Sequence, residues 1–224
     1  MNASYKTAIK YKDLHISAKM LKVSHDSSIE LNQLCKDSKE RVRYRKYCPS
    51  CDKEITNEDI VKGYQYMTSP SRYITISEQE INSLKLENDS YLNVLYFCKQ
   101  REISGLLIDK QYYLIPEMDS EKEYSLFRKA LISNRVVGIA EIVLGTKQEL
   151  VALFANKDCI IATILFYENE LNELPIMFKH KVSKDDMDEL KTCIMEDTKS
   201  FDWQSHFDKF QLRLRELIVS KIPK

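Results

Sequence analysis

Hydrophobic and polar residues alternate with a period of two along much of the chain. Together with β-branched and aromatic residues, this period predicts strands at residues 5–11, 14–23, 41–47, 60–67, 91–98 and 112–115. Three further strands are predicted at 135–144, 148–155 and 159–167, separated by short connections that contain Gly145-Thr146 and Asn156-Lys157-Asp158. Such short connections join neighbouring strands in antiparallel order, so this part of the chain is predicted to be a meander.

A helical period predicts four further elements. Ser77 and Glu80 form a capping box that opens a short helix ending near Leu86. A longer helix is predicted over 120–133, a third is capped by Ser183, and a fourth opens at Asp202. The apolar residues that share one face of the last three helices are Tyr124, Phe127 and Leu131; Met187, Leu190 and Ile194; and Trp203, Phe207, Phe210, Leu214 and Leu217. The last face favours packing on the chain's own domain, with an oligomer interface as the alternative.

Composition places the chain among folded proteins of one domain, or of one domain with an appendage. It has 224 residues, of which 43% are hydrophobic, and this is enough for a core. No apolar run approaches the ~20 residues that cross a bilayer, and the first residues lack the apolar region of a secretion signal. A cytoplasmic protein without a membrane partner is therefore expected. The 34 basic and 34 acidic residues exclude a uniformly basic coat for nucleic acid.

The charge is nevertheless distributed unevenly. Between Lys36 and Lys53, seven basic residues against three acidic ones leave a local charge of seven minus three, or +4. If 41–47 is a strand, its period of two places Arg41, Arg43 and Arg45 on one face. Guanidinium groups in a row suit phosphate oxygens, because each donates two parallel hydrogen bonds. The alternative is a solvated edge strand whose charges prevent aggregation.

Two of the six cysteines, Cys48 and Cys51, are three residues apart in a Pro-Ser turn. Two thiolates at this spacing suit one tetrahedral metal ion. A redox pair is an alternative, although that motif belongs at the start of a helix in a βαβ unit, which the pattern does not predict. Two turn cysteines without a role are a second alternative. The cysteines that lie among apolar residues, and are therefore expected in the core, are Cys98, Cys159 and Cys193.

Motifs of the common enzyme classes are missing from the sequence. Neither GxxxxGK[ST] nor GxGxxG nor GxSxG occurs, and four glycines offer few loops for phosphate. The four histidines are scattered without metal-site spacing. Asp185 and Asp186 are explained as negative charge at a helix N-terminus rather than as a catalytic pair. The sequence therefore indicates a protein that is not an enzyme.

Residues 41–51 (RVRYRKYCPSC) and 58–66 (EDIVKGYQY) resemble the bacterial Ku family. The resemblance continues in YYLIP at 112–116, in RKAL at 128–131 and in VGIA at 137–140. It extends through the meander into the last helical segments, and so covers nearly the whole chain.

The resemblance implies an α+β fold that is mainly β. It implies a Ku-type β-barrel core over residues 1–182, a zinc-ribbon-like bridge region at about 29–67, and a C-terminal helical arm at 183–224. Two copies would form a homodimeric ring that threads onto double-stranded DNA ends without sequence preference. The ring would protect and bridge the ends and recruit an ATP-dependent DNA ligase for non-homologous end joining. The implied place of action is the nucleoid.

A ring that encloses DNA reads its backbone, so the contacts implied by the resemblance are basic. The residues expected to bind DNA are Arg41, Arg43, Arg45 and Lys46, followed by Lys62, Lys110, Lys179 and Lys181. Many bacterial relatives have Leu-His-Lys where this chain has Cys35 between Leu and Lys, and His and Cys interchange at zinc sites. The expected ligands of one Zn²⁺ per protomer are Cys35, Cys48 and Cys51, with His25 or Asp37 as guesses for the fourth.

The chain departs from the family in two places. The glycines and proline of the family's opening pattern are absent from residues 5–14, so the first barrel strand is expected to differ in detail. The Lys-rich tail of many relatives does not follow Lys224, and less inward sliding along DNA is therefore expected. Two other functions stay open. One is a phage-type, Gam-like protein that shields DNA ends from nucleases, and the other is a thiol oxidoreductase using Cys48 and Cys51.

Overall fold

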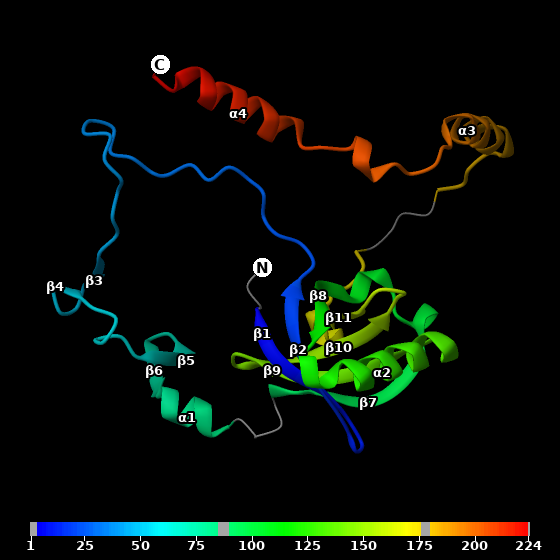
Figure 1. The fold of residues 1–224 in the computed structure, drawn as a ribbon. Helices are drawn as coiled ribbons and strands as arrows, with labels where there is room; N and C mark the ends of the chain where they lie inside the picture. The colour runs from blue at the N-terminus through cyan, green and yellow to red at the C-terminus, as the bar shows by residue number, and fades with distance from the viewer. Residues whose placement is uncertain (1–3, 85–89, 176–179, 224) are drawn as a thin grey trace. The chain divides into compact units, whose positions relative to one another are not determined.

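The computed structural model describes residues 4–84, 90–175 and 180–223. The chain forms two compact units. The first comprises Met1–His25 and Val42–Leu171, and the second comprises Asp26–Arg41 and Asn172–Lys224. Figure 1 shows the elements of both units along the chain. None of the helices in the described ranges is both long enough and apolar enough to cross a membrane.

The first unit contains a closed barrel of seven strands. Around the barrel the strands follow the order β1 (Tyr5–Tyr11), β2 (Leu14–Lys22), β8 (Ile108–Pro116), β11 (Ile160–Leu165), β10 (Lys147–Ala155), β9 (Val136–Leu144) and β7 (Leu92–Lys99). Six neighbouring pairs are antiparallel, and the predicted meander of β9, β10 and β11 is confirmed. β1 and β7 close the barrel in parallel through two partner pairs, Ile9 with Leu92 and Lys10 with Asn93.

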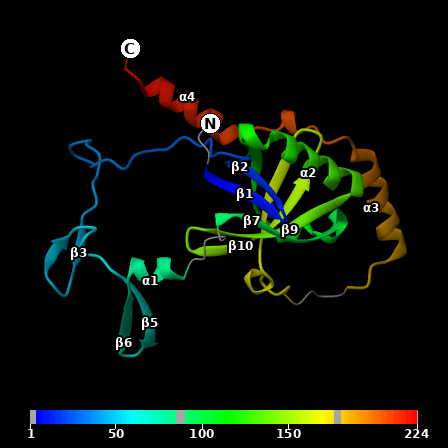
Figure 2. The same ribbon diagram turned by 60° about the horizontal axis from the view of Figure 1, so that its bottom comes forward.

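Apolar side chains from all seven strands form the core together with one side of helix α2 (Glu121–Asn134). Figure 2 shows α2 lying along the barrel. Its buried residues are Tyr124, Phe127 and Leu131, the face that the sequence predicts. The Tyr124 hydroxyl donates to the carbonyl of Leu114 at 2.6 Å and accepts from the N–H of Ile160 at 2.7 Å. These two bonds fasten α2 to β8 and β11.

Two hairpins and a short helix lie between β2 and β7 in the sequence. β3 (Lys46–Cys48) pairs with β4 (Lys53–Ile55), and β5 (Lys62–Thr68) pairs with β6 (Ser71–Ile76). Helix α1 (Glu78–Ser83) carries the predicted capping box, in which the Ser77 hydroxyl accepts from the N–H of Glu80 and the Glu80 carboxylate accepts from the N–H of Ser77. The strand predicted at 41–47 is wrong at its start, because β3 begins only at Lys46.

The second unit contains helices α3 (Lys184–Asp197) and α4 (Lys209–Lys221). α3 begins as predicted, since the Ser183 hydroxyl accepts from the N–H of Asp186. The predicted start of the last helix at Asp202 is wrong. Asp202 caps only a single 3₁₀ turn, whereas the Asp208 carboxylate accepts from two N–H groups and opens α4.

Segment 26–41 and α4 are connected within the second unit. The N–H of Ile29 donates to the side-chain oxygen of Gln211 at 2.9 Å. On the predicted apolar face of the last helix, Leu214 is half-buried. The other four residues of that face are exposed, namely Trp203, Phe207, Phe210 and Leu217. The expectation that this face packs on the chain's own domain is therefore not met for most of its residues.

Candidate nucleic-acid interface

The basic segment lies partly outside regular structure. Arg41 belongs to the second unit and forms an isolated β-bridge with Leu34. Arg43 and Arg45 precede β3, and only Lys46 lies in the strand. All four basic residues are exposed. The alternation that would place the three arginines on one strand face is therefore absent.

Arg45 is the one arginine of the segment with an ion pair in the described chain. Its Nη1 lies 2.9 and 3.1 Å from the two carboxylate oxygens of Glu54 on β4, which raises the pKa of Arg45. The register pairs Tyr47 with Glu54, so Arg45 is the diagonal neighbour of Glu54 across the hairpin. Both side chains are more than half exposed, at 76% and 56%. An exposed pair of this kind contributes little free energy, so a phosphate can compete for the guanidinium.

The β3–β4 hairpin is held by further polar contacts. The Lys46 ammonium donates to the side-chain oxygen of Asn57 at 2.5 Å. The Tyr47 hydroxyl donates to the Asp52 carboxylate, and this hydrogen bond raises the pKa of Tyr47. Arg41 and Arg43 differ from Arg45, because neither forms an ion pair within the ranges that the structure describes. Their guanidinium groups need not leave a carboxylate before they bind a phosphate.

The four lysines expected as weaker DNA contacts lie apart from one another in the sequence. Lys62 on β5 lies 3.7 Å from the Glu78 carboxylate, and Lys110 on β8 lies 2.8 Å from Asp109. Lys181 is exposed in the second unit. Lys179 lies outside the described residues. The structure therefore assembles no cluster from these lysines in the part of the chain that it describes.

The β5–β6 hairpin carries exposed aromatic residues that the pattern of charged residues does not reveal. Tyr64 and Tyr73 are 62% and 61% exposed, and Tyr66 is also more than half exposed. Tyr64 pairs with Ile74, whereas Tyr73 pairs with Gln65 in the next register position, so the two tyrosines lie on opposite faces. A two-stranded hairpin with exposed aromatic side chains on both faces indicates a binding surface. The signal in the sequence was the run of aromatic and β-branched residues at 73–76 (YITI).

The cysteines form an incomplete set of metal ligands. A hydrogen bond between the Cys48 and Cys51 thiols lowers the pKa of Cys48 and raises that of Cys51. Cys35 belongs to the second unit, where hydrogen bonds from Ser38 lower its pKa from 9.0 to about 7. Among the described residues, no three Cys, His, Asp or Glu side chains come together as a metal site would require. The hairpin thus supplies two thiol ligands, half of a tetrahedral set.

The other three cysteines divide between the two units. Cys98 and Cys159 are partly buried in the barrel unit, where burial raises the pKa of both thiols. Cys193 on α3 is exposed. The prediction of a core position is therefore wrong for Cys193, because α3 buries none of its residues.

Comparison with known proteins identifies the barrel. The family model described as "Ku70/Ku80 beta-barrel domain" matches residues 10–192. Among curated relatives, "Non-homologous end joining protein Ku" of Lachnoclostridium phytofermentans is 33% identical over 98% of this chain and 85% of its own length. Proteins of the same name from Bacillus subtilis and Archaeoglobus fulgidus are each 26% identical over 99% of this chain, which covers 72% and 88% of their lengths. Because the family model spans six of the seven barrel strands in full, together with α2 and much of α3, this chain belongs to the bacterial Ku family.

Proposed function

We propose that this protein binds the ends of broken double-stranded DNA in non-homologous end joining, as a ring of two copies. The observation that carries the proposal is the match to a relative named for this pathway over 98% of the chain, at 33% identity. The role is one of binding rather than catalysis. Double-stranded DNA as the partner implies a place at the nucleoid in the cytoplasm. A division into a core of residues 1–182 and an arm of residues 183–224 remains part of the proposal.

The proposed contacts with phosphate come first from the basic segment. Arg41 and Arg43 are exposed and, in the described chain, carry no ion pair, so they bind phosphate most readily. On binding DNA, the Arg45 guanidinium leaves the Glu54 carboxylate and binds a phosphate instead. Lys46, at the start of β3, provides a further contact with phosphate. The secondary contacts are Lys62, Lys110, Lys179 and Lys181. Contacts of this kind are independent of base sequence.

Salt dependence tests these contacts one at a time. Arg43→Ala is expected to reduce the slope of log K against log salt by about 0.9, since one phosphate contact is lost. Arg45→Ala is expected to reduce it by less, because Arg45 first releases Glu54. An unchanged slope for Arg43→Ala would remove Arg43 from the DNA interface.

The proposed dimer uses exposed apolar residues of the chain. Candidates are the exposed tyrosines of the β5–β6 hairpin, Tyr64, Tyr66 and Tyr73, together with Phe210 and Leu217 on α4. A twofold pairing buries the same surface on both copies and closes without forming a filament. Sedimentation of the purified protein is expected to give two copies per particle.

The experiment that tests the proposed function compares linear and covalently closed circular duplex of the same sequence. At ~150 mM salt, where nonspecific surface contacts are screened, the linear form is expected to bind and the circle to bind little. Comparable affinity for both forms would contradict a ring that loads at ends. A second arm adds an ATP-dependent DNA ligase of the same pathway. Stimulated ligation supports end joining, whereas nuclease protection without stimulation supports an end-shielding protein of the Gam-like kind.

Zinc binding remains a separate proposal. Cys48 and Cys51 offer two thiolates, which suit Zn²⁺, and Cys35 is the proposed third ligand. Metal analysis of protein purified without chelator tests it, and less than about 0.2 equivalents of zinc would contradict the proposal. A thiol oxidoreductase is the weaker alternative for the same pair, and disulfide reduction of a model substrate would support it.

A further inference from the structure

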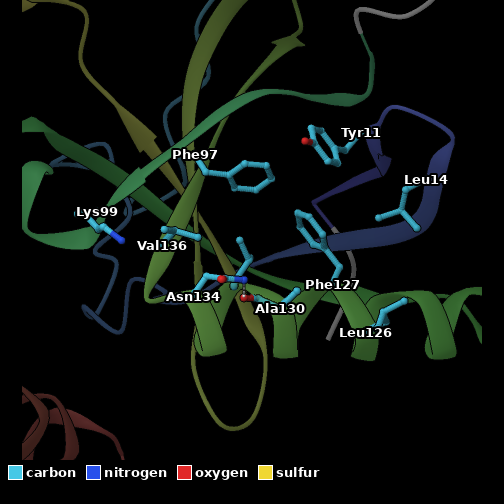
Figure 3. Close-up of a pocket in the computed structure, with 10 residues that line it drawn as sticks. Tyr11, Leu14, Phe97, Lys99, Leu126, Phe127, Ala130, Asn134 and Val136 are labelled. Carbon is cyan, nitrogen blue, oxygen red and sulfur yellow. Dashed lines mark hydrogen bonds between the residues drawn. The ribbon is translucent and has the colours of Figure 1, made fainter.

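An apolar groove opens on the barrel beside helix α2. Its volume is about 550 Å³, within the range of ligand and peptide pockets. Figure 3 shows Tyr11, Phe97 and Phe127 turned toward one another across the groove. Tyr11 and Phe97 meet edge to face with centroids 5.1 Å apart, and Phe97 and Phe127 lie 6.3 Å apart. The groove therefore offers an aromatic floor formed by side chains of β1, β7 and α2.

Helix α2 forms one wall of the groove. Leu126, Ala130 and Asn134 line the groove at successive intervals of four residues, so they form one ridge along the helix. Leu126 is 67% exposed although it lies among apolar neighbours. Because the side chain of Ala130 is small, the middle of this wall is recessed. A large apolar side chain from elsewhere fits between this ridge and the aromatic floor.

The opposite wall is an open strand edge. β7 pairs with β9 from Asn93 to Lys99 with a bulge at Leu95, and its partnership with β1 ends at Asn93. Residues 94–99 thus have no strand partner on the β1 side in the described part of the chain. Every second residue of such an edge offers its N–H and C=O to an added strand. Phe97 and Lys99 of this open stretch line the groove directly.

Within the described ranges, the groove has one charged lining residue, which is basic, and two further basic residues adjoin lining residues in the sequence. Lys99 lines it, Lys12 lies over the Tyr11 ring with its Nζ 5.3 Å from the centroid, and Arg135 follows Asn134 at the end of α2. None of these three forms an ion pair with a carboxylate in the described residues. Asp13, in the turn between β1 and β2, is the neighbouring acidic residue. The rim therefore complements a negatively charged partner.

We propose that this groove binds an extended peptide of a partner protein, which adds a strand to the open edge of β7, inserts one large apolar side chain between Phe97 and α2, and places acidic side chains near Lys99. The surface is separate from the basic segment, so it extends the proposed function without depending on it. Backbone pairing supplies affinity, and the apolar pocket together with Lys99 supplies specificity.

The test uses the full-length protein and a defined probe. The probe is a fluorescein-labelled octapeptide of alternating threonine and valine with one phenylalanine followed by two glutamates. Saturable binding by fluorescence anisotropy is expected with Kd below about 100 µM, typical of a weak docking peptide. Lysines in place of the glutamates, or alanine in place of the phenylalanine, are expected to weaken binding at least about tenfold. Absence of saturable binding up to about 1 mM would overturn the proposal.

Two variants locate the binding site. Ala130→Phe fills the low point of the α2 wall and is expected to weaken peptide binding at least about tenfold. Ser125→Phe adds the same ring on the exposed, opposite side of α2 and is expected to change binding less than about twofold. Equal effects of the two variants would overturn the proposal. Affinity for linear DNA is expected to be the same in both variants, which separates this test from that of the proposed function.

Hydrogen exchange tests the added strand. Peptide binding is expected to slow exchange of amides within residues 94–99, since half of them gain a partner on the open edge. Unchanged exchange there, despite peptide binding, would overturn the strand addition. If Ala130→Phe instead changes the number of copies per particle, the groove is an interface between copies of this chain and the proposal is wrong.

Discussion

At the residue scale, the contact that bears most on the proposed DNA interface is the ion pair between Arg45 and Glu54. The capping box of Ser77 and Glu80 was predictable, because both partners lie within one turn. The ion pair of Arg45 and Glu54 was not, because it depends on the register of a hairpin whose second strand has three residues, two of them charged. The period of two also predicted the wrong arrangement of Arg41, Arg43 and Arg45. An alternating pattern determines the face on which a side chain lies only where the chain forms a strand.

Glu54→Gln isolates the influence of this ion pair on DNA binding. The substitution frees the Arg45 guanidinium, so affinity for linear duplex is expected to rise about twofold to fivefold, in line with the small free energy of an exposed pair. Fluorescence anisotropy with a labelled duplex measures the change. Glu58→Gln removes the same charge from a nearby exposed residue without an ion pair in the described chain, and less than about a twofold gain is expected. Equal gains from both substitutions would show that Arg45 is not restrained by Glu54.

Cys35 gives a prediction for pH dependence. Its pKa is lowered to about 7 because the Ser38 hydroxyl and nearby N–H groups stabilise the thiolate. In chelator-treated protein, alkylation of Cys35 by iodoacetamide is therefore expected to be fast above pH 7 and to fall as the pH drops through about 7. Cys98 should react more slowly, since burial raises its pKa. Peptide mass spectrometry follows both sites.

Ser38→Ala provides the control for this measurement. Without the hydroxyl, the pKa of Cys35 is expected to rise toward 9.0, and the alkylation profile should move to higher pH. A profile that is the same in both proteins would contradict the role of Ser38.

At the scale of elements, the barrel strands and α2 were predictable because their apolar residues keep one period over many residues. Tyr124, Phe127 and Leu131 mark the buried face of α2 correctly. The start of α4 was misplaced because Asp202 and Asp208 are both good N-caps, and sequence alone does not distinguish a single turn from a helix. β6 was missed because a Ser-Pro turn separates it from β5, and β4 because it is short and polar.

Tyr124→Phe tests how α2 is fastened to the barrel. Loss of the hydroxyl leaves the buried Leu114 carbonyl and Ile160 N–H without this partner, so the free energy of unfolding is expected to fall by about 2–3 kcal/mol. Urea denaturation followed by circular dichroism measures the loss. Tyr113→Phe removes a more exposed hydroxyl and is expected to change the free energy by less than about 0.5 kcal/mol. If the two substitutions are equally mild, the hydroxyl does not hold α2 in place.

At the scale of the whole molecule, the net charge of zero does not argue against DNA as the partner. Acidic residues are frequent on α3, where Asp185 and Asp186 occupy the first turn. The segment between Lys36 and Lys53 carries +4. The sequence resemblance indicated the family and its barrel fold, because the motifs of residues 41–51 and 58–66 are typical of that family. Which surfaces meet in a dimer depends on a second copy, and no pattern within one chain specifies it.

Enclosure of DNA is tested most directly by trapping. Protein is loaded on linear duplex, the ends are ligated into a closed circle, and the complex is washed with ~1 M salt, which removes contacts that rely on charge alone. A ring is expected to stay on the circle through the wash and to leave when one restriction cut reopens it. Release from the intact circle at the same rate as from linear DNA would contradict a ring around the duplex.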